Sequence, residues 1–370
     1  MKQVGIVTLY LFTNYGGILQ AWALQQVLSR LGHKPVTIQV LPFQLPGLFT
    51  EFIFIFIKLI QRCILRKQVT SLFPFREFHA KMKRKEMYTR QFIDKNINTL
   101  EIKAFSDVPN KFDSLIVGSD QVWRPKYYGY GKIAHAYLKF ASDWNVRRLS
   151  YGASFGTDKW EYSDVQTQEC CELAHRFDAV SVREKSAIKL AKEYLGVQAQ
   201  QVLDPTMLLD KEDYEQLVIA AGEPISDGDL FCYVLDKNDE IETLIETVAN
   251  QQGLKPFYIG VSENIPDYMD FTQPPVEKWL RAFMDARFVI TDSFHACVFS
   301  ILFHKPFIVM GNEGRGNTRF DTLLNMFGLT DRLVTDGQVR PEHFEPLPAS
   351  VYEKLDEWRQ SSLAFIKDNI

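Results

Sequence analysis

The chain has few cysteines, and nothing in their pattern would support a disulfide framework or a zinc site. It contains five cysteines in 370 residues, an odd number without a C-x-x-C pair or a zinc-like His/Cys spacing. We therefore expect reduced thiols, as in a cytosolic protein. Long apolar runs are also missing. The longest unbroken one, residues 52–57, is far too short to span a bilayer.

An excess of charge of one sign is absent as well. The 42 basic and 46 acidic side chains give a formal net charge of −4, so no overall positive field would recruit nucleic acid. Apolar residues make up 46% of the chain and charged residues 24%, which excludes a disordered tail, a collagen-like repeat and a disulfide-rich mini-domain. At about 150 residues per domain, the length predicts two domains.

Several well-known catalytic and nucleotide-binding motifs do not occur. There is no P-loop, no G-x-S-x-G elbow, no H-E-x-x-H and no carboxylate cluster suited to Mg²⁺. The turn after the first expected strand is not G-x-G-x-x-G, and the second strand ends in Gln39-Val40 without a ribose-binding acid. We therefore expect no metal site, no nicotinamide and no other cofactor. The candidate sites that are present are suited to anions.

What the sequence does contain is an alternation of apolar strands and amphipathic helices. Residues 4–9 form an apolar run typical of a parallel strand buried on both faces. A signal peptide is not expected here, because residues 14–17 stand where its small-residue cleavage site would be needed. A second alternating series begins near residue 206. The pattern predicts an α/β fold with two Rossmann-like doubly wound domains facing a cleft. We assign residues 1–205 to the N-terminal domain, with an insertion at about 42–100. Residues 206–345 form the C-terminal domain, on the side of the cleft where a donor substrate would bind. Residues 346–370 form a helix that packs back toward the N-terminal domain.

The insertion is basic and aromatic. Residues 58–85 contain nine Lys or Arg and one acid, a local charge of +8 in an acidic protein. Cations recur at four-residue spacing beside the apolar run, at Lys58, Arg62 and Arg66. Such a helix suits an anionic membrane surface, which residues 52–85 would contact. The alternative is a core-packed helix with a solvated edge. We expect a cytoplasmic protein, peripheral on the inner face of the cytoplasmic membrane if residues 52–85 bind there.

Polar and glycine residues follow three expected strands of the N-terminal domain. The carboxyl ends of such strands border the ligand crevice of an open sheet. Glycines let a ligand approach the backbone, and amides at a helix start attract anions. We expect these residues to line the cleft or to hold an acceptor: Asn14, Tyr15, Gly16, Gly17, Ser119, Asp120, Gln121 and Ser154. The alternatives are a plain tight turn at 14–17 and an Asx-type turn at Asp120.

Arginines occur where a strand ends and where a glycine-rich loop begins. Arg183 ends a buried strand and opens a helix, which favours bidentate contact with a phosphate or carboxylate. The alternative is a surface pair of Arg183 with Glu184. Arg315 and Arg319 belong to a polar loop after the strand at 307–310 and could close over an anion. The alternative is a solvated loop without a ligand.

A histidine is expected in the first turn of a helix. Asp292 or Ser293 is suited to cap that helix, which would place His295 beside its amides, after Phe294. A hydroxyl, backbone amides and an imidazole would then converge on one anion-sized spot. A lone histidine is more often structural, but this one follows a strand at the expected cleft.

Three stretches together resemble the polysaccharide pyruvyl transferase family. They are Asn14-Tyr15-Gly16-Gly17 with Leu19-Gln20-Ala21, the segment Gly118-Ser119-Asp120-Gln121-Val122-Trp123, and Asp292-Ser293-Phe294-His295 through Lys305-Pro306-Phe307. The resemblance implies a GT-B-like fold and transfer of an enolpyruvyl-derived group from phosphoenolpyruvate, the substrate, to a sugar of a polysaccharide or lipid-linked oligosaccharide precursor. The product would be a pyruvate ketal, with phosphate released.

One motif departs from the family pattern. Many relatives carry Arg-Leu-His where this chain has Ser293-Phe294-His295, which is similar to a subgroup among capsule and exopolysaccharide gene products. Arg315 or Arg319 could supply the charge that is missing at 293.

From the resemblance and the motifs, we expect His295 to be the general acid that gains its proton when the donor binds. The donor-binding residues would be Arg183, Ser293, Phe294, Arg315 and Arg319. The alternatives are a GT-B glycosyltransferase using a nucleotide sugar and a non-catalytic scaffold of polysaccharide assembly.

Overall fold

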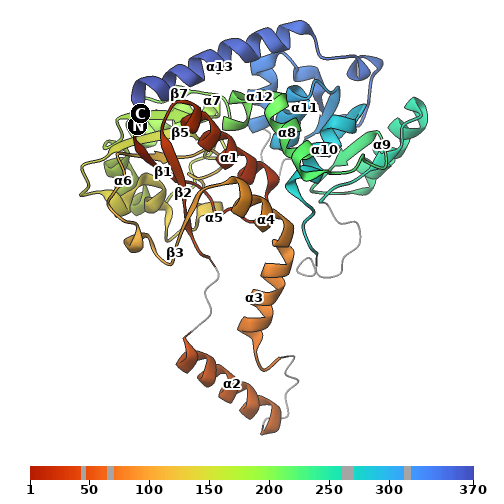
Figure 1. Cartoon of the computed structure of the whole chain (residues 1–370). Helices are drawn as coiled ribbons and strands as arrows, with labels where there is room; N and C mark the ends of the chain where they lie inside the picture. Colours follow the sequence, from red (N-terminus) through yellow and green to blue (C-terminus); the bar gives the residue numbers. More distant parts are fainter. Residues whose placement is uncertain (43–46, 65–70, 261–270, 312–317) are drawn as a thin grey trace.

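The computed structural model describes residues 1–42, 47–64, 71–260, 271–311 and 318–370, and within them it contains two parallel sheets (Figure 1). The first sheet has seven strands in the order β3-β2-β1-β4-β5-β6-β7. Their bounds are β1 (Gln3–Val7), β2 (Lys34–Val40), β3 (Thr99–Ile102), β4 (Ser114–Val117), β5 (Arg147–Ala153), β6 (Ala179–Val182) and β7 (Gln200–Gln201). The order reverses between β1 and β4, so the switch point at which such sheets bind ligands lies between these two strands.

The second sheet has five parallel strands in the order β12-β11-β10-β8-β9. Their bounds are β8 (Leu230–Tyr233), β9 (Pro256–Phe257), β10 (Phe288–Thr291), β11 (Phe307–Met310) and β12 (Leu333–Val334). This order reverses between β8 and β10, which puts the second switch point at their carboxyl ends. The expectation of two Rossmann-like doubly wound domains is confirmed.

Helices connect the strands and cover the sheets. In chain order they are α1 (Tyr15–Arg30), α2 (Leu48–Cys63), α3 (Pro74–Lys85), α4 (Met87–Asn96), α5 (Pro125–Tyr128), α6 (Asp164–Ala174), α7 (Lys185–Tyr194), α8 (Lys211–Ala221), α9 (Asp239–Gln252), α10 (Val276–Asp285), α11 (Phe294–Leu302), α12 (Thr318–Phe327) and α13 (Ala349–Asn369). Helix α1 begins at Tyr15, because the Asn14 side chain accepts a hydrogen bond from the Gly17 amide at 3.2 Å and so caps its first turn.

An apolar core joins the two domains. Tyr15 of α1 stacks on Trp279 of α10 with ring centroids 5.4 Å apart, and both side chains are fully buried. The Tyr15 hydroxyl donates a hydrogen bond to the Pro274 carbonyl at 2.9 Å. Aromatic pairs of this kind add stability beyond the area that they bury. The stack therefore helps to fix one domain against the other.

The last helix, α13, crosses from the second domain to the first (Figure 1). The Leu203 amide donates to the Ser362 hydroxyl at 3.0 Å, and the Phe365 ring lies 6.3 Å from that of Tyr151. At the end of the chain, Lys2 donates to the Ile370 carbonyl at 2.8 Å. These contacts bring the two termini together and tie the second domain to the first.

Replacing Trp279 by alanine should destabilise the protein by about 3–5 kcal/mol, because the substitution removes a large aromatic side chain from a packed interface. Replacement by phenylalanine should cost clearly less, since the indole N–H has no hydrogen-bond partner to lose. Urea unfolding of both variants measures the difference. An equal loss in the free energy of unfolding for both substitutions would contradict an interface held by ring packing.

Candidate active site

The first turns of α1 and α11 meet where the two domains face each other. His295 lies in the first turn of α11 and packs against Gly16 in the first turn of α1. A Cβ built on Gly16 would lie only 2.1 Å from the imidazole ring. Only glycine therefore leaves room for this approach, and the contact places the two switch-point helices side by side.

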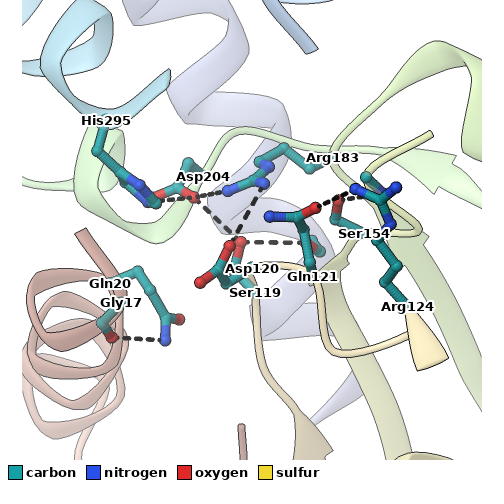
Figure 2. A network of polar contacts seen from close by, with 12 residues as sticks. Gly17, Gln20, Ser119, Asp120, Gln121, Arg124, Ser154, Arg183, Asp204 and His295 are labelled. Atoms are coloured by element: carbon teal, nitrogen blue, oxygen red, sulfur yellow. Dashed lines mark hydrogen bonds and ion pairs between the residues drawn. The ribbon is translucent and has the colours of Figure 1, made fainter. Parts of the chain in front are cut away.

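A buried carboxylate links the two domains (Figure 2). Asp204 follows β7, and its Oδ2 accepts a hydrogen bond from Arg183 Nη1 at 2.8 Å. The hydroxyl of Ser119 lies 3.1 Å from the same oxygen, and the amide and hydroxyl of Thr206 donate to Oδ1 at 3.1 and 2.7 Å. Nε2 of His295 lies 3.6 Å from Oδ2. Asp204 thus contacts a guanidinium of the first domain and an imidazole of the second.

These contacts keep the Asp204 carboxyl ionised. Burial opposes its ionisation, but His295, Arg183 and Thr206 outweigh burial and hold its pKa well below the usual range. A charged group inside a protein is tolerated only when it is paired and hydrogen-bonded. The Asp204 carboxylate meets both conditions.

Arg183 is held in the interior on several sides. Its guanidinium carbon lies 4.2 Å from the centre of the Phe294 ring, and its side chain is 3% exposed. Nη2 lies 3.8 Å from Asp120 Oδ1 and 3.7 Å from Glu184 Oε1. Burial lowers the pKa of Arg183, but Glu184, Asp204 and Asp120 reverse that effect and raise it. A surface pair of Arg183 with Glu184, the alternative considered above, is excluded because both side chains are buried.

Several polar atoms around this cluster lack hydrogen-bond partners. In the described part of the chain, thirteen buried side-chain atoms are unpartnered, and five of them belong to four residues here. They are Arg183 Nε and Nη2, Glu184 Oε2, His295 Nε2 and Arg319 Nε. An unpartnered buried polar atom costs about 1–3 kcal/mol, so this group of atoms is suited to a ligand that supplies the missing contacts. Arg183, Glu184, Phe294 and Arg319 also line one cavity between the domains.

Arg319 brings a second guanidinium to this cavity from α12. Burial, followed by the charge of Arg183, lowers the pKa of Arg319. Among the described residues, no carboxylate forms an ion pair with it, so its charge is available to an anion. Arg315, expected to close over the ligand with Arg319, lies outside the described residues.

Most of the cleft residues expected in the first domain join the same network. Asp120 has a positive φ of 69°, a conformation that non-glycine residues adopt mainly at functional or strained positions. Asn14 Nδ2 lies 3.5 Å from Asp120 Oδ2. The Ser154 hydroxyl donates to Glu184. Gln121 instead accepts a hydrogen bond from Arg124 at 3.2 Å, toward the rim of the network.

Two details differ from the expectations. The side chains of Asp292 and Ser293 were expected to cap α11, but Ser293 occupies the cap position without a side-chain cap bond. The Asp292 carboxylate instead accepts hydrogen bonds from the amides of Leu235 and Asp236 at 2.7 and 2.9 Å. Tyr15 is also not open to a ligand, because its ring is fully buried against Trp279.

The sequence motifs missed two residues at the centre of the site. Asp204 was not among the expected site residues, although an Asp-Pro pair directly after an apolar run was a usable signal. Glu184 was named only as a surface partner of Arg183. Among the described residues, no cluster of three or more His, Cys, Asp or Glu side chains is placed to hold a metal ion.

A family model described as polysaccharide pyruvyl transferase matches residues 14–314. No curated protein matches the chain significantly. Among solved structures, this chain is similar to UDP-GlcNAc 2-epimerase from Methanocaldococcus jannaschii, with 12% sequence identity and a TM-score of 0.46. The match covers 98% of this chain and 93% of that chain. For UDP-GlcNAc 2-epimerase from Neisseria meningitidis bound to UDP-GlcNAc, the identity is 8%, the coverages are 98% and 93%, and the TM-score is 0.46.

The buried Asp204 predicts a particular dependence of stability on pH. Because its pKa is lower in the folded protein than in the unfolded chain, it stabilises the fold above the ordinary aspartate pKa of about 3.9, and this stability is lost as pH falls further toward the folded pKa. In Asp204→Asn, the free energy of unfolding should fall less steeply below that pH, by up to about 1.4 kcal/mol per pH unit.

Urea unfolding at a series of pH values measures these slopes. Asp227→Asn, which alters a fully solvated carboxylate, is the matched control and should leave the slope unchanged. A wild-type slope equal to that of Asp204→Asn would show that Asp204 is not held ionised in the folded protein.

Proposed function

Because the chain belongs to the polysaccharide pyruvyl transferase family, we propose that it transfers the enolpyruvyl-derived group of phosphoenolpyruvate to two hydroxyls of a sugar. The product is a pyruvate ketal, and inorganic phosphate is released. One observation carries the proposal, namely the unpartnered polar atoms of Arg183, Glu184, His295 and Arg319 around one buried location. A small, highly charged donor would satisfy them.

The donor carries two anionic groups, and the site offers two cations for them. Arg183 uses Nη1 for Asp204, which leaves Nε and Nη2, the edge that binds an oxyanion with two parallel hydrogen bonds. We assign the donor carboxylate to this edge. The phosphate is assigned to Arg319 and to the first amides of α11, beside the half-buried Ser293, because a helix N-terminus favours an anion. Arg319 then supplies the charge missing at position 293.

We assign to His295 the donation of a proton to the donor. Its Nε2 lacks a hydrogen-bond partner and lies 3.6 Å from Oδ2 of the Asp204 carboxylate. Protonation of the methylene carbon turns it into a methyl group and creates an oxocarbenium-like centre at the adjacent carbon. The Phe294 ring holds Arg183 beside this centre by stacking on the guanidinium.

We assign to Glu184 the removal of a proton from the acceptor. Its Oε1 accepts a hydrogen bond from Ser154, while Oε2 has no partner. The two sugar hydroxyls form the two new C–O bonds of the ketal, and the C–O bond to phosphate breaks. The hydroxyls release two protons; one replaces the proton that His295 gave to carbon, and the other leaves with phosphate.

Calorimetric titration with phosphoenolpyruvate and with UDP tests the donor. We expect phosphoenolpyruvate to bind more tightly, and its apparent enthalpy to differ between two buffers of different ionisation heat because His295 takes up a proton. Methyl glycosides with 4,6 or cis vicinal hydroxyl pairs should then stimulate phosphate release. Tight UDP binding with no phosphoenolpyruvate binding would indicate a glycosyltransferase, and binding of neither would indicate a scaffold.

Replacing His295 by glutamine should slow phosphate release by about 10²–10⁴-fold, the usual contribution of a general acid. Glutamine keeps a polar side chain near Gly16 and Asp204, so the affinity for phosphoenolpyruvate should change much less than the rate. His175→Gln, a solvated histidine outside the site, is the control. Near-normal turnover of His295→Gln would exclude the general-acid role.

A further inference from the structure

Helix α2 lies away from both sheets (Figure 1). One of its faces is apolar and exposed in the described part of the chain. Phe49, Phe52, Ile53 and Phe56 line one apolar groove on it. The side chains of Phe49, Phe52 and Phe56 are 80%, 76% and 63% exposed. A contiguous patch of large apolar side chains on a surface marks an interaction site. The core-packed helix considered from the sequence is therefore not what α2 forms.

The opposite side of α2 is attached to α3. Glu51 accepts hydrogen bonds from Nε and Nη2 of Arg76 at 2.5 and 2.8 Å. The rings of Phe54 and Phe75 meet edge to face with centroids 4.9 Å apart. These two contacts set how α2 is turned about its axis. As a result, the groove residues face outward rather than toward α3.

Positive charge accompanies the apolar face. Residues 58–85 carry a formal charge of +8 in a chain of net charge −4, so the rest of the chain carries −12. Not every cation is available, since Arg76 is paired with Glu51 and Lys85 is buried, with 2% exposed. Lys58, Arg62, Lys83 and Arg84 form no ion pair with any residue in the described ranges. A positively charged segment on an otherwise acidic protein orients that segment toward an anionic surface.

We propose that α2 and α3 dock this protein on the surface of an anionic lipid bilayer, with the α2 groove residues inserted at the interface. A helix with an apolar face, a polar face and nearby cations binds such a surface in its plane. No helix in the described segments has the length and apolar character needed to cross a bilayer.

Flotation with vesicles tests the docking. The wild-type protein should float at low salt with vesicles of phosphatidylglycerol and phosphatidylcholine in equal parts, and should remain at the bottom with phosphatidylcholine alone. Phe52→Ser with Phe56→Ser should reduce partitioning by about tenfold or more for each ring removed. Lys58→Glu with Arg62→Glu should reduce it by at least tenfold, since each cation near such a surface contributes roughly fivefold.

Matched controls change similar side chains on the body of the protein. Val165 and Ile225 are 77% and 76% exposed, and Lys189 and Lys192 are solvated cations one turn apart on α7. Val165→Ser with Ile225→Ser, and Lys189→Glu with Lys192→Glu, should both float like wild type. All variants should release phosphate from phosphoenolpyruvate at the wild-type rate with a water-soluble acceptor, because none lies at the catalytic site.

Three results would overturn the proposal. The wild-type protein could fail to float with anionic vesicles at low salt, or the body variants could lose as much partitioning as the α2 variants. Sedimentation could also show a dimer that Phe52→Ser with Phe56→Ser dissociates, which would assign the face to a second copy. Docking does not depend on the proposed chemistry, so failure of one leaves the other standing.

Discussion

The pairing of the buried Asp204 carboxylate with Arg183 and His295 is the interaction on which the rest of the site depends. A carboxylate out of contact with water is tolerated only if charged and hydrogen-bonding groups surround it. Asp204 obtains its guanidinium from the first domain and its imidazole from the second. The cost of leaving either group unpaired therefore holds the two domains in a specific relation. It also keeps Arg183 and His295 at fixed positions on either side of Asp204.

The fold supports this arrangement through glycine and aromatic packing. Gly16 allows the first turns of α1 and α11 to touch, and the stack of Tyr15 on Trp279 fixes the neighbouring surfaces. The switch points of the two sheets therefore lie beside the same cluster of polar side chains. There, Arg183, Glu184, His295 and Arg319 retain atoms that no protein group satisfies. A site assembled on rigid elements with its polar groups held ready stabilises developing charge without rearranging during the reaction.

Much of the fold could be predicted from the sequence, because buried parallel strands leave an apolar signal in a short window. The strand Phe307–Met310 occupies the residues expected for it, and β1 (Gln3–Val7) overlaps the apolar run at 4–9. The partners of single side chains could not be predicted in this way. Asp204 and His295 are far apart in sequence, and nothing local to Arg183 indicated that it is buried. Likewise, Asp292 was available as a helix cap, but the loop after β8 supplies amides that bind it instead.

The net charge of −4 also averages over two groups of charged residues in different parts of the molecule. Those at the domain interface form a buried network, to which we assign a small anionic donor, whereas Arg62, Lys83 and Arg84 on α2 and α3 are exposed. A crystal structure of the complex with phosphoenolpyruvate tests the proposed donor site most directly. It should show the donor carboxylate on Nε and Nη2 of Arg183, the phosphate on Arg319 and the α11 amides, and the methylene carbon beside His295 Nε2. A donor bound away from these groups, or a cavity that stays empty at saturating phosphoenolpyruvate, would contradict the proposed chemistry.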